Sequence, residues 1–320
     1  MEGCYSPEQF NVTSYDATAL AIITFEAFPG MWINAFIVSV ICMTWVRKKT
    51  LNSNEKILLL LGSSRFWCLC VSWVFSFLSL IYPKYLHVHP IFQLSNSAQN
   101  FLNCSNFWVS ACLCVFYCIK IATFRNSFFI YLKVKVDRMV PWLLLGSVFF
   151  SLVIGTAVYN VADKALCKNL NLTCQECIWE ARIRIEEHFL PVSFIIGLGF
   201  ATPFTAVIFS ALLLLFSLWR HKRNMQTNSM KDLSMDAHIK AMKCILSFFI
   251  MYSMNFSLLI YTTIYVKIEE NHMMLMIYAY MYAYWGVHSL ILIFSNPSLE
   301  TTLLRILPCL KCKFCMTQEL

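Results

Sequence analysis

The sequence predicts an all-α membrane protein, a bundle of seven transmembrane helices with its N-terminus outside and its C-terminus inside. Three observations support this prediction. Of the 320 residues, 59% are hydrophobic and only 13% are charged, whereas a soluble domain carries about 25% charged residues. The apolar residues form long blocks, and a block of about 20 such residues can cross a bilayer as a helix. The basic residues gather in alternate connections between the blocks.

The apolar blocks follow one another along most of the chain. We expect transmembrane helices at 18–46, 56–82, 98–124, 139–162, 189–219, 237–266 and 273–295. The connections are short, and the chain has neither an internal repeat nor a low-complexity segment. The expected organisation is an extracellular N-terminus at 1–17, one seven-helix domain at 18–295 and a cytoplasmic tail at 296–320.

The distribution of Lys and Arg predicts the orientation. These residues are dense in segments 47–56, 120–138 and 220–243 and in the tail, and they are sparse in the other connections. Cytoplasmic connections carry the excess of Lys and Arg, so these segments are expected inside. The same topology explains the net charge of +8 without a nucleic-acid partner. Residues 1–17 have no basic start or cleavage site of a signal peptide, so the first span is expected to direct its own insertion.

Two glycosylation signals lie on the predicted outer side. Asn11 and Asn171 each begin an Asn-x-Thr sequence, and such sequences are glycosylated only where the chain is translocated. Matching sequences at Asn103 and Asn255 lie inside predicted spans, so we interpret them as chance matches.

The cysteines fall into three groups by predicted location. The outer group consists of Cys4, Cys167, Cys174 and Cys177, which permits two disulfides in three pairings, or free thiols. A tail group, Cys309, Cys312 and Cys315, lies next to the membrane. Palmitoylation is favoured there over a zinc site, because the short basic tail has no His. Most of the other cysteines are expected to pack as small apolar residues.

Polar residues inside the predicted spans are the strongest candidates for function. Arg65 lies near the centre of the second span, and Asn34 lies at a similar depth in the first; His288 and Ser289 lie in the seventh. Ionisable residues in a bilayer face the bundle interior and are paired. We expect Asn34 to offer its amide oxygen to the guanidinium, and the last helix to offer hydroxyls and carbonyls. Such a cluster can hold helices in register, repack between two states, or do both.

Several function classes are disfavoured by what the sequence lacks. No nucleophile elbow, zinc-protease motif, pair of carboxylates on one helix face or glycine-rich phosphate loop is evident. We therefore expect no enzyme activity, no catalytic residues, no metal and no cofactor. A transporter commonly shows repeats and broken helices, and a channel shows a filter or a ring of charge. Neither pattern is evident.

Linear motifs in the right order resemble one receptor family. They are "AQNFLNCSNFWVSACLCVFYCIKIATF" (98–124), "INAF" (33–36), "SSRFW" (63–67), "TPF…LLLLFSLWRHKRNMQ" (202–226), "DAHIKAMKCILSFFIMYSMNF" (236–256) and "HSLILIFSNPSLE" (288–300). Together they resemble the type 2 (bitter) taste receptors over nearly the whole chain. In that family the second helix carries an arginine where rhodopsin-like receptors usually place an aspartate, which matches Arg65. The vomeronasal type 1 receptors are the nearest alternative, but Phe116-Tyr117-x-x-Lys120 and His288-Ser289 favour taste.

The resemblance implies a pocket for small bitter compounds in the outer half of the bundle. Gln99, Asn103 and Phe107 share one helix face by their spacing. Matched residue by residue, the family's pocket positions are Gln99, Asn103, Asn255 and Tyr278. Many members have aromatic residues where Gln99 and Asn255 stand, so a more polar pocket is expected. Tyr282, one turn from Tyr278, adds aromatic surface to the expected binding set, although an aromatic belt at the membrane interface is the alternative interpretation.

The resemblance also implies the partners. The expected partner is a heterotrimeric G protein, gustducin-like or another Gi-type, and its expected contacts are Lys120, Arg125, His221, His238 and Lys240. The sequence thus predicts a multi-pass plasma-membrane receptor for small-molecule bitter agonists, surrounded by membrane lipid. A vomeronasal type 1 pheromone receptor is the alternative, and a membrane transporter or channel is a more distant one.

Overall fold

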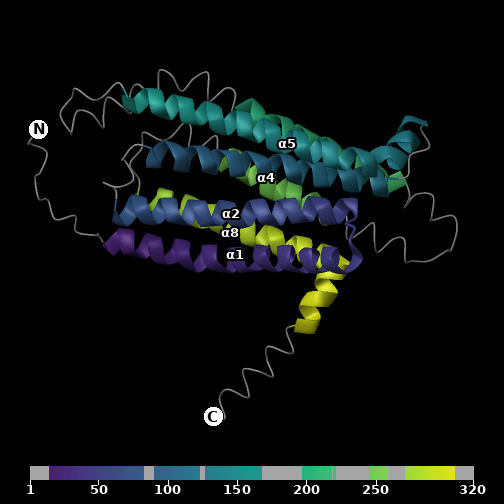
Figure 1. Ribbon diagram of the computed structural model, residues 1–320, viewed down its shortest axis with the longest axis horizontal. Helices are drawn as coiled ribbons and strands as arrows, with labels where there is room; N and C mark the ends of the chain where they lie inside the picture. The colour runs from purple at the N-terminus through teal and green to yellow at the C-terminus, as the bar shows by residue number, and fades with distance from the viewer. Residues whose placement is uncertain are drawn as a thin grey trace, which may run out of the picture.

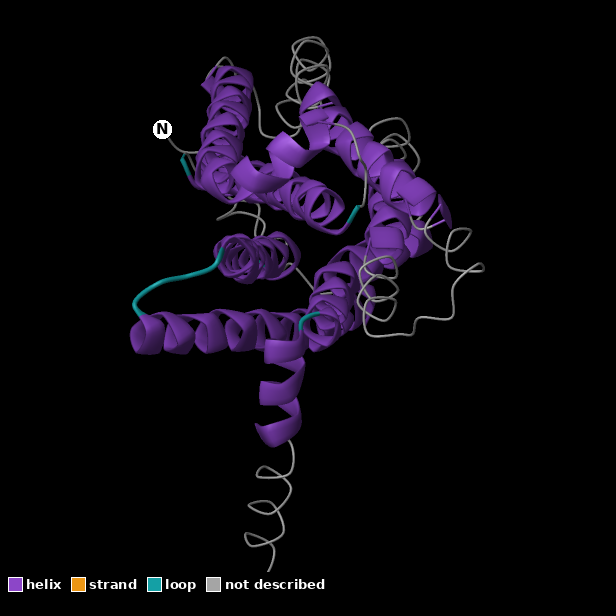
Figure 2. Cartoon of the chain, turned by 90° about the vertical axis from the view of Figure 1, so that its right-hand side faces the viewer, coloured by secondary structure: helices purple, strands orange, loops and turns teal. Residues whose placement is uncertain are grey.

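The computed structural model describes residues 14–82, 90–122, 127–167, 197–217, 219–220, 245–258 and 271–306. Within these ranges every regular element is an α-helix (Figure 2). The labelled helices are α1 (Ser14–Lys48), α2 (Ser53–Ile81), α4 (Ile91–Ile121), α5 (Ser127–Cys167) and α8 (Asn271–Ser295). Further helices cover Gly197–Ser217 and Ile245–Leu258, and a short one covers 297–306.

The long helices lie side by side in a bundle (Figure 1). α1 packs against α2 and α8, α2 also packs against α4, and α4 packs against α5. α1 ends, α2 begins, α4 ends and α5 begins at one end of the bundle, which we call the Lys48 end. The opposite end, where α1 and α8 begin, is the Ser14 end. Figure 1 shows the 297–306 helix turning away from α8 at the Lys48 end.

Local sequence signals mark several helix ends. Asp16 lies in the first turn of α1 and Arg47 and Lys48 in its last turn, where each charge complements the helix dipole. Lys49 follows with a φ of 59°, a left-handed conformation that ends the helix. The backbone N–H of Asn52 donates to the Glu55 carboxylate at 2.8 Å, which is one half of a capping box at the start of α2.

The structure corrects several predicted boundaries. The third helix begins at Ile91 rather than 98, and the fourth covers Ser127–Cys167 rather than 139–162. Residues 127–138, which were expected to form a basic connection, are therefore helical. Lys and Arg are good helix formers, and Val136 of this segment is buried, so packing extends the helix beyond the purely apolar block.

Membrane-spanning character is shown for part of the bundle. Helices long and apolar enough to cross a bilayer cover Asp16–Lys48, Ser53–Ile81, Ile91–Ile121, Ser127–Asp163 and Gly197–Ser217, and a shorter apolar helix covers Ile245–Leu258. The described residues thus form a helical membrane bundle. The expectation of seven spans, the three-part division of the chain and the orientation of its ends stay predictions.

The outer surface of this bundle is apolar, as expected for contact with lipid. Large side chains such as Phe25, Trp32 and Trp142 are 80%, 74% and 73% exposed. Meanwhile polar residues such as Asn34, Arg65 and His288 are fully buried. Lipid does not drive apolar side chains inward, so the bundle interior is where polar groups find partners.

Candidate functional site

The side chain of Arg65 lies at the centre of the bundle. It is 0% exposed and is among the largest fully buried side chains of the described residues. Its neighbours along α2 include the buried Leu61, Cys68 and Leu69. A charged residue at the centre of a membrane helix costs about 2.5–3.5 kcal/mol on insertion scales. The surrounding helices must therefore solvate the guanidinium.

Two other helices supply hydrogen-bond partners to Arg65. Its Nη1 donates to the Ser289 hydroxyl at 3.0 Å, and its Nη2 donates to the Ser110 hydroxyl at 3.3 Å. Nη2 also lies 2.6 Å from Nδ1 of His288. Because a guanidinium can only donate, Nδ1 of His288 must accept, so the neutral ring carries its proton on Nε2. The Trp285 ring covers the cation, with its centroid 5.6 Å from Cζ.

Asn34 joins this cluster through Ser289. The Ser289 hydroxyl donates to Oδ1 of Asn34 at 2.8 Å, while Nδ2 of Asn34 donates to the Gly30 carbonyl at 2.8 Å. Asn34 is thus linked to Arg65 through Ser289, and its expected direct contact with the guanidinium stays a prediction. Ser289 has a hydroxyl that accepts and donates at once, so it bridges α2 and α1 from its place on α8. We call Asn34, Arg65, Ser110, His288 and Ser289 the arginine cluster.

The sequence interpretation missed part of this polar centre. Ser110 of α4 was not predicted, nor was the buried pair next to it, in which the Ser64 hydroxyl donates to Oδ1 of Asn106 at 2.7 Å. Asn106 and Ser110 are spaced i, i+4, and Ser64 precedes Arg65 in the chain. The helical spacing was a usable signal, because it predicts that both α4 residues share one face.

An aromatic cage lies beside the arginine cluster. The Phe248 ring packs edge-on against His288, with centroids 3.8 Å apart. The buried Tyr252 donates its hydroxyl to the Phe107 carbonyl at 2.9 Å. Phe107 also stacks in T-shaped geometry on Phe200, Tyr252 and Trp285, with centroids 4.8, 4.6 and 6.1 Å away. These rings link α4 to α8 and to the helices Gly197–Ser217 and Ile245–Leu258.

The first cavity borders this cage. Its volume is about 80 Å³, and its lining residues are Asn103, Phe107, Phe200, Tyr252, Asn255, Phe256, Leu258, Met281, Tyr284 and Trp285. Three residues of the predicted binding set, Asn103, Phe107 and Asn255, therefore meet here. The wall is mainly aromatic, with two amides, a composition that suits a largely apolar ligand with one or two polar groups.

The second cavity lies between α1, α2, α4 and α8. Its volume is about 290 Å³, and its lining residues are Ala19, Ile23, Leu69, Ser72, Phe75, Ser76, Ser79, Leu80, Asn96, Gln99, Asn103, Met281, Tyr282 and Trp285. Gln99 and Tyr282 of the predicted binding set lie here rather than in the first cavity. Asn103, Met281 and Trp285 line both cavities and form the partition between them. The side chain of Tyr278 lies outside the described residues.

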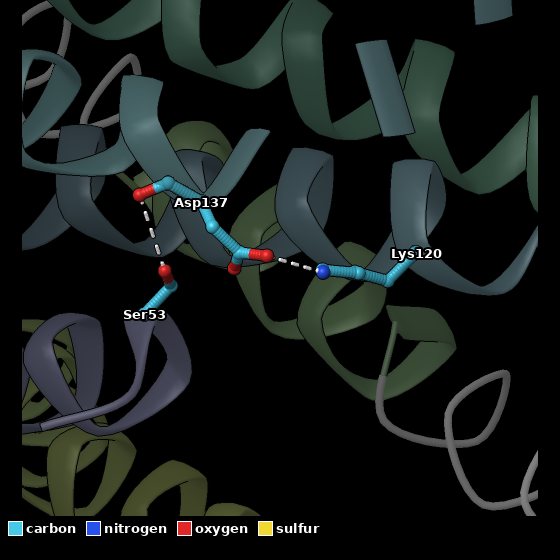
Figure 3. A network of polar contacts seen from close by, with 3 residues as sticks. All are labelled: Ser53, Lys120 and Asp137. Carbon is cyan, nitrogen blue, oxygen red and sulfur yellow. Dashed lines mark hydrogen bonds and ion pairs between the residues drawn. The ribbon is translucent and has the colours of Figure 1, made fainter. Parts of the chain in front are cut away.

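A second polar network joins three helices at the Lys48 end (Figure 3). The ammonium of Lys120, in the last turn of α4, pairs with the Asp137 carboxylate of α5 at 2.6 Å. The Ser53 hydroxyl of α2 donates to the Asp137 backbone carbonyl at 3.4 Å. Lys120 was predicted as a G-protein contact, and here it is held in an ion pair. The other predicted contacts lie outside the described residues: Arg125, His221, His238 and Lys240.

The predictions for the outer side also lie outside the described residues. These are the glycosylation sites Asn11 and Asn171 and the cysteines Cys4, Cys174 and Cys177, together with the side chain of Cys167. The cysteines of the predicted cytoplasmic tail lie outside the described residues as well. Within the described ranges, the cysteines at 42, 68, 70, 104, 112, 114 and 118 are free thiols. The described residues contain no group of three or more metal-ligating side chains.

The fold and the two polar networks define a helical membrane bundle with a buried polar centre. The bundle holds a buried cation at its centre, cavities towards the Ser14 end and an ion pair at the Lys48 end. The helices that carry these features run the length of the bundle. Comparison with known proteins identifies the family. The family model described as "Taste receptor protein (TAS2R)" matches residues 12–311, so the chain belongs to the taste receptor protein family. This family consists of receptors rather than enzymes.

Individual relatives cover almost the whole chain. "Taste receptor type 2 member 7" of Macaca mulatta is 33% identical over 91% of this chain and 92% of its own length. "Taste receptor type 2 member 40" of Gallus gallus is 32% identical over 92% and 95%. "Taste receptor type 2 member 9" of Homo sapiens is 30% identical over 94% and 96%. The predicted resemblance to type 2 taste receptors is thus confirmed.

Proposed function

We propose that this protein is a bitter taste receptor that binds small, mostly apolar compounds and signals through a gustducin-like or other Gi-type G protein. Family membership supports the receptor class. The proposed topology is seven spans in the plasma membrane with the N-terminus outside. It is supported by the basic residues near the Lys48 end, since cytoplasmic connections carry the excess of Lys and Arg.

The proposed agonist site is the aromatic first cavity, with Asn103 as its main polar contact. Phe107 and Asn255 complete the described part of this site, and Gln99, Tyr278 and Tyr282 are proposed to contact larger agonists. At about 80 Å³ the cavity is smaller than the 300–1,000 Å³ of typical ligand sites. Agonist binding is therefore expected to displace its aromatic walls.

Trp285 carries the proposed coupling from ligand to signal. Its ring lines the first cavity and lies over Arg65, so a ligand that moves this ring changes the cover of the buried cation. The arginine cluster joins α1, α2, α4 and α8, and a change in its hydrogen bonds favours a different packing of these helices. An agonist shifts this equilibrium only through its difference in affinity for the two packings.

The proposed G-protein contact lies at the Lys48 end. Lys120 is engaged by Asp137 in the described structure, so coupling is expected to replace this ion pair with contacts to the G protein. The basic residues Arg125, His221, His238 and Lys240 are proposed to complete the contact. The pair is partly exposed, so breaking it costs on the order of 0–1 kcal/mol, an amount that a G protein can supply.

The proposed function is tested by recording calcium responses to a library of bitter compounds. The receptor is expressed in cells together with a chimeric G protein, and surface expression is measured in parallel. Concentration-dependent responses to some compounds are expected. Silence towards the whole library by a receptor shown to be at the surface would contradict the proposal.

Asn103→Ala is expected to raise the half-maximal concentration of most agonists by about tenfold, because one hydrogen bond contributes about 1–1.5 kcal/mol. Asn100→Ala is the matched control. Asn100 lies on the same helix and bonds only to Asn96 of that helix among the interactions described. Equal dose–response curves for both variants and the wild type would remove Asn103 from the site.

A further inference from the structure

One face of α5 near the Lys48 end carries two cations between two aromatic rings. Tyr131, Lys135, Arg138 and Trp142 are spaced by four, three and four residues, so they share this face. All four are exposed, whereas Val136 on the opposite side of the helix is buried. α5 runs along one edge of the bundle (Figure 1) and packs against α4 and α2. The face with the two cations is therefore open to the surroundings of the bundle.

The length of α5 places this face at the boundary between hydrocarbon and lipid headgroups. The helix Ser127–Asp163 covers 37 residues, and at 1.5 Å per residue it is about 55 Å long. The hydrocarbon core of a bilayer is about 30 Å thick, and residues 139–162 contain no Asp, Glu, Lys or Arg. Residues 127–138 therefore extend beyond the hydrocarbon. Trp and Tyr gather at such a boundary, as Tyr131 and Trp142 do here.

The charges of Lys135 and Arg138 are available to a ligand. Nζ of Lys135 donates to the Tyr131 hydroxyl at 2.5 Å and lies 4.3 Å from the centroid of that ring. These contacts orient the ammonium without neutralising it. Neither Lys135 nor Arg138 forms an ion pair with another residue that the structure describes. The carboxylate of Asp137, which lies between them in the sequence, is held by Lys120 of α4.

The spacing of the two cations suits a phosphate group. Side chains three residues apart on a helix have Cβ atoms about 5–6 Å apart, so Lys135 and Arg138 can contact one phosphate together. The guanidinium can bind two of its oxygens at once, and the ammonium adds a point charge. A zwitterionic headgroup brings a cation of its own, which the pair repels. The pair therefore favours a headgroup with a net negative charge.

An apolar track continues from the basic pair towards the middle of the bundle. Trp142, Leu145 and Phe149 are 73%, 60% and 67% exposed, and their spacing of three and four residues keeps them on the same face. An acyl chain can lie along this track while its headgroup contacts the basic pair. A free anion would use the basic pair alone. The continuity of the basic pair with a track at hydrocarbon depth thus identifies a lipid as the occupant.

We propose that this face of α5 is a binding site for a phospholipid whose headgroup carries a net negative charge. Lys135 and Arg138 bind the phosphate, Tyr131 orients the lysine, and the apolar track holds an acyl chain. The site lies apart from both cavities and from the proposed agonist contacts. Its assignment to the cytoplasmic leaflet rests on the proposed topology, whereas lipid binding by the purified protein does not.

Native mass spectrometry of the purified full-length receptor in a neutral detergent tests the site. The receptor is titrated with phosphatidylserine or with phosphatidylcholine of the same acyl chains, and the dissociation constant of the first bound lipid is measured. The double variant Lys135→Gln and Arg138→Gln removes the basic pair. The matched control is Lys49→Gln and Lys133→Gln, which removes two exposed cations at the same end of the bundle. Lys133 lies two residues before Lys135 and therefore on another side of α5.

The wild type is expected to bind phosphatidylserine about tenfold more tightly than phosphatidylcholine, because Lys and Arg attract anionic lipids. Loss of the basic pair is expected to weaken phosphatidylserine binding by about tenfold, and the control pair by less than about twofold. Equal dissociation constants for the two double variants would overturn the site. Equal affinity of the wild type for the two lipids would overturn the preference for a negative headgroup. If the double variant does not fold, Arg138→Gln is compared with Lys133→Gln instead.

Two further arms test the choice of a lipid over a free anion. Trp142→Ala is expected to weaken phosphatidylserine binding, whereas Trp32→Ala, which removes a ring that is 74% exposed on α1, is expected not to. Equal affinities of these two variants would overturn the apolar track. Ammonium phosphate, at the ionic strength of the ammonium acetate that it replaces, is expected to leave the lipid bound, and displacement would overturn the lipid as occupant. No agonist or G protein is present, so failure of the proposed function would appear only in the calcium assay.

Discussion

At the scale of the residue, the arginine cluster shows how a permanent charge is kept inside a membrane helix. Arg65 places its two terminal nitrogens among a hydroxyl of α4, a hydroxyl of α8 and an imidazole of α8. Ser289 matters most among these partners, because it also donates to Asn34. A hydroxyl that bridges two buried polar groups cannot be removed without leaving both with one partner fewer.

Ser289→Ala is therefore expected to lower the free energy of unfolding by about 1–3 kcal/mol, since Asn34 and Arg65 each lose a buried hydrogen bond. The measurement is thermal unfolding of the purified receptor. Ser295→Ala is the matched control on the same helix, because its hydroxyl bonds only to the Ile291 carbonyl among the interactions described. Equal melting temperatures for the two variants would contradict the bridging role.

At the scale of the element, α1 and α8 lie in close backbone contact where two glycines meet. A Cβ atom on Gly286 would lie 3.4 Å from Cα of Gly30, and one on Gly30 would lie 2.9 Å from a methyl of Leu69. Small residues at helix crossings let membrane helices pack backbone to backbone. This crossing lies one turn from Asn34 on α1 and close to His288 on α8, so it brings the arginine cluster together.

Gly286→Leu is expected to separate α1 from α8 and to destabilise the receptor by about 1–3 kcal/mol through overpacking. Surface expression and melting temperature are the measurements. Gly146→Leu is the control, because a Cβ on Gly146 meets nothing within 4 Å. A Gly286→Leu receptor as stable as the Gly146→Leu receptor would show that the crossing tolerates a side chain.

The ion pair at the Lys48 end is a contact between elements, because it ties α4 to α5. Asp137→Asn removes the carboxylate charge that holds Lys120. If freeing Lys120 favours G-protein coupling, basal signalling is expected to rise, by up to about fivefold for a pair worth 0–1 kcal/mol. The measurement is agonist-independent G-protein activation at matched surface expression. Asp163→Asn, which removes a charge from the far end of α5, controls for net charge. Unchanged basal signalling in Asp137→Asn would contradict the idea that the ion pair restrains Lys120.

At the scale of the whole molecule, the bundle is arranged for lipid outside and polar contacts inside. Apolar rings such as Phe25 and Trp142 cover the surface, while Asn34, Arg65 and Asn106 are fully buried. In a bilayer the outer rings meet hydrocarbon, and inner polar groups such as Arg65 and Asn106 find hydrogen-bond partners on neighbouring helices. The orientation of this bundle in the membrane is the prediction that belongs to this scale.

Glycosylation reports that orientation. Asn11 and Asn171 lie on the proposed outer side, so removal of N-glycans by a glycosidase is expected to increase the receptor's gel mobility. The double variant Asn11→Gln and Asn171→Gln is expected to migrate the same way with and without the enzyme. Asn255→Gln is the control, because Asn255 lies within an apolar helix and should leave the glycan shift unchanged. A shift that persists in the double variant would contradict the assigned sites.

Particular residues show how far sequence reasoning reached. The helical class, the family and the burial of Arg65 followed from composition, motifs and the cost of charge in lipid. The link from Asn34 to Arg65 through Ser289 could not be predicted from the sequence. Spacing places residues on one face of a helix, but it does not say which helix that face contacts. The helix at 127–138 was missed for a related reason. Its basic residues are typical of a cytoplasmic connection, and only the structure shows that Val136 packs in the bundle.

The sequence by itself determined that this chain is a helical membrane protein of the taste receptor family with a buried arginine. Each of these properties depends on local composition or on the order of motifs. Only the tertiary structure decided that the predicted binding residues divide between two cavities. Asn103 lines both cavities, and Trp285 separates them from Arg65. That division depends on how each helix is rotated and where it crosses its neighbours, and these geometries arise only when all the side chains pack at once.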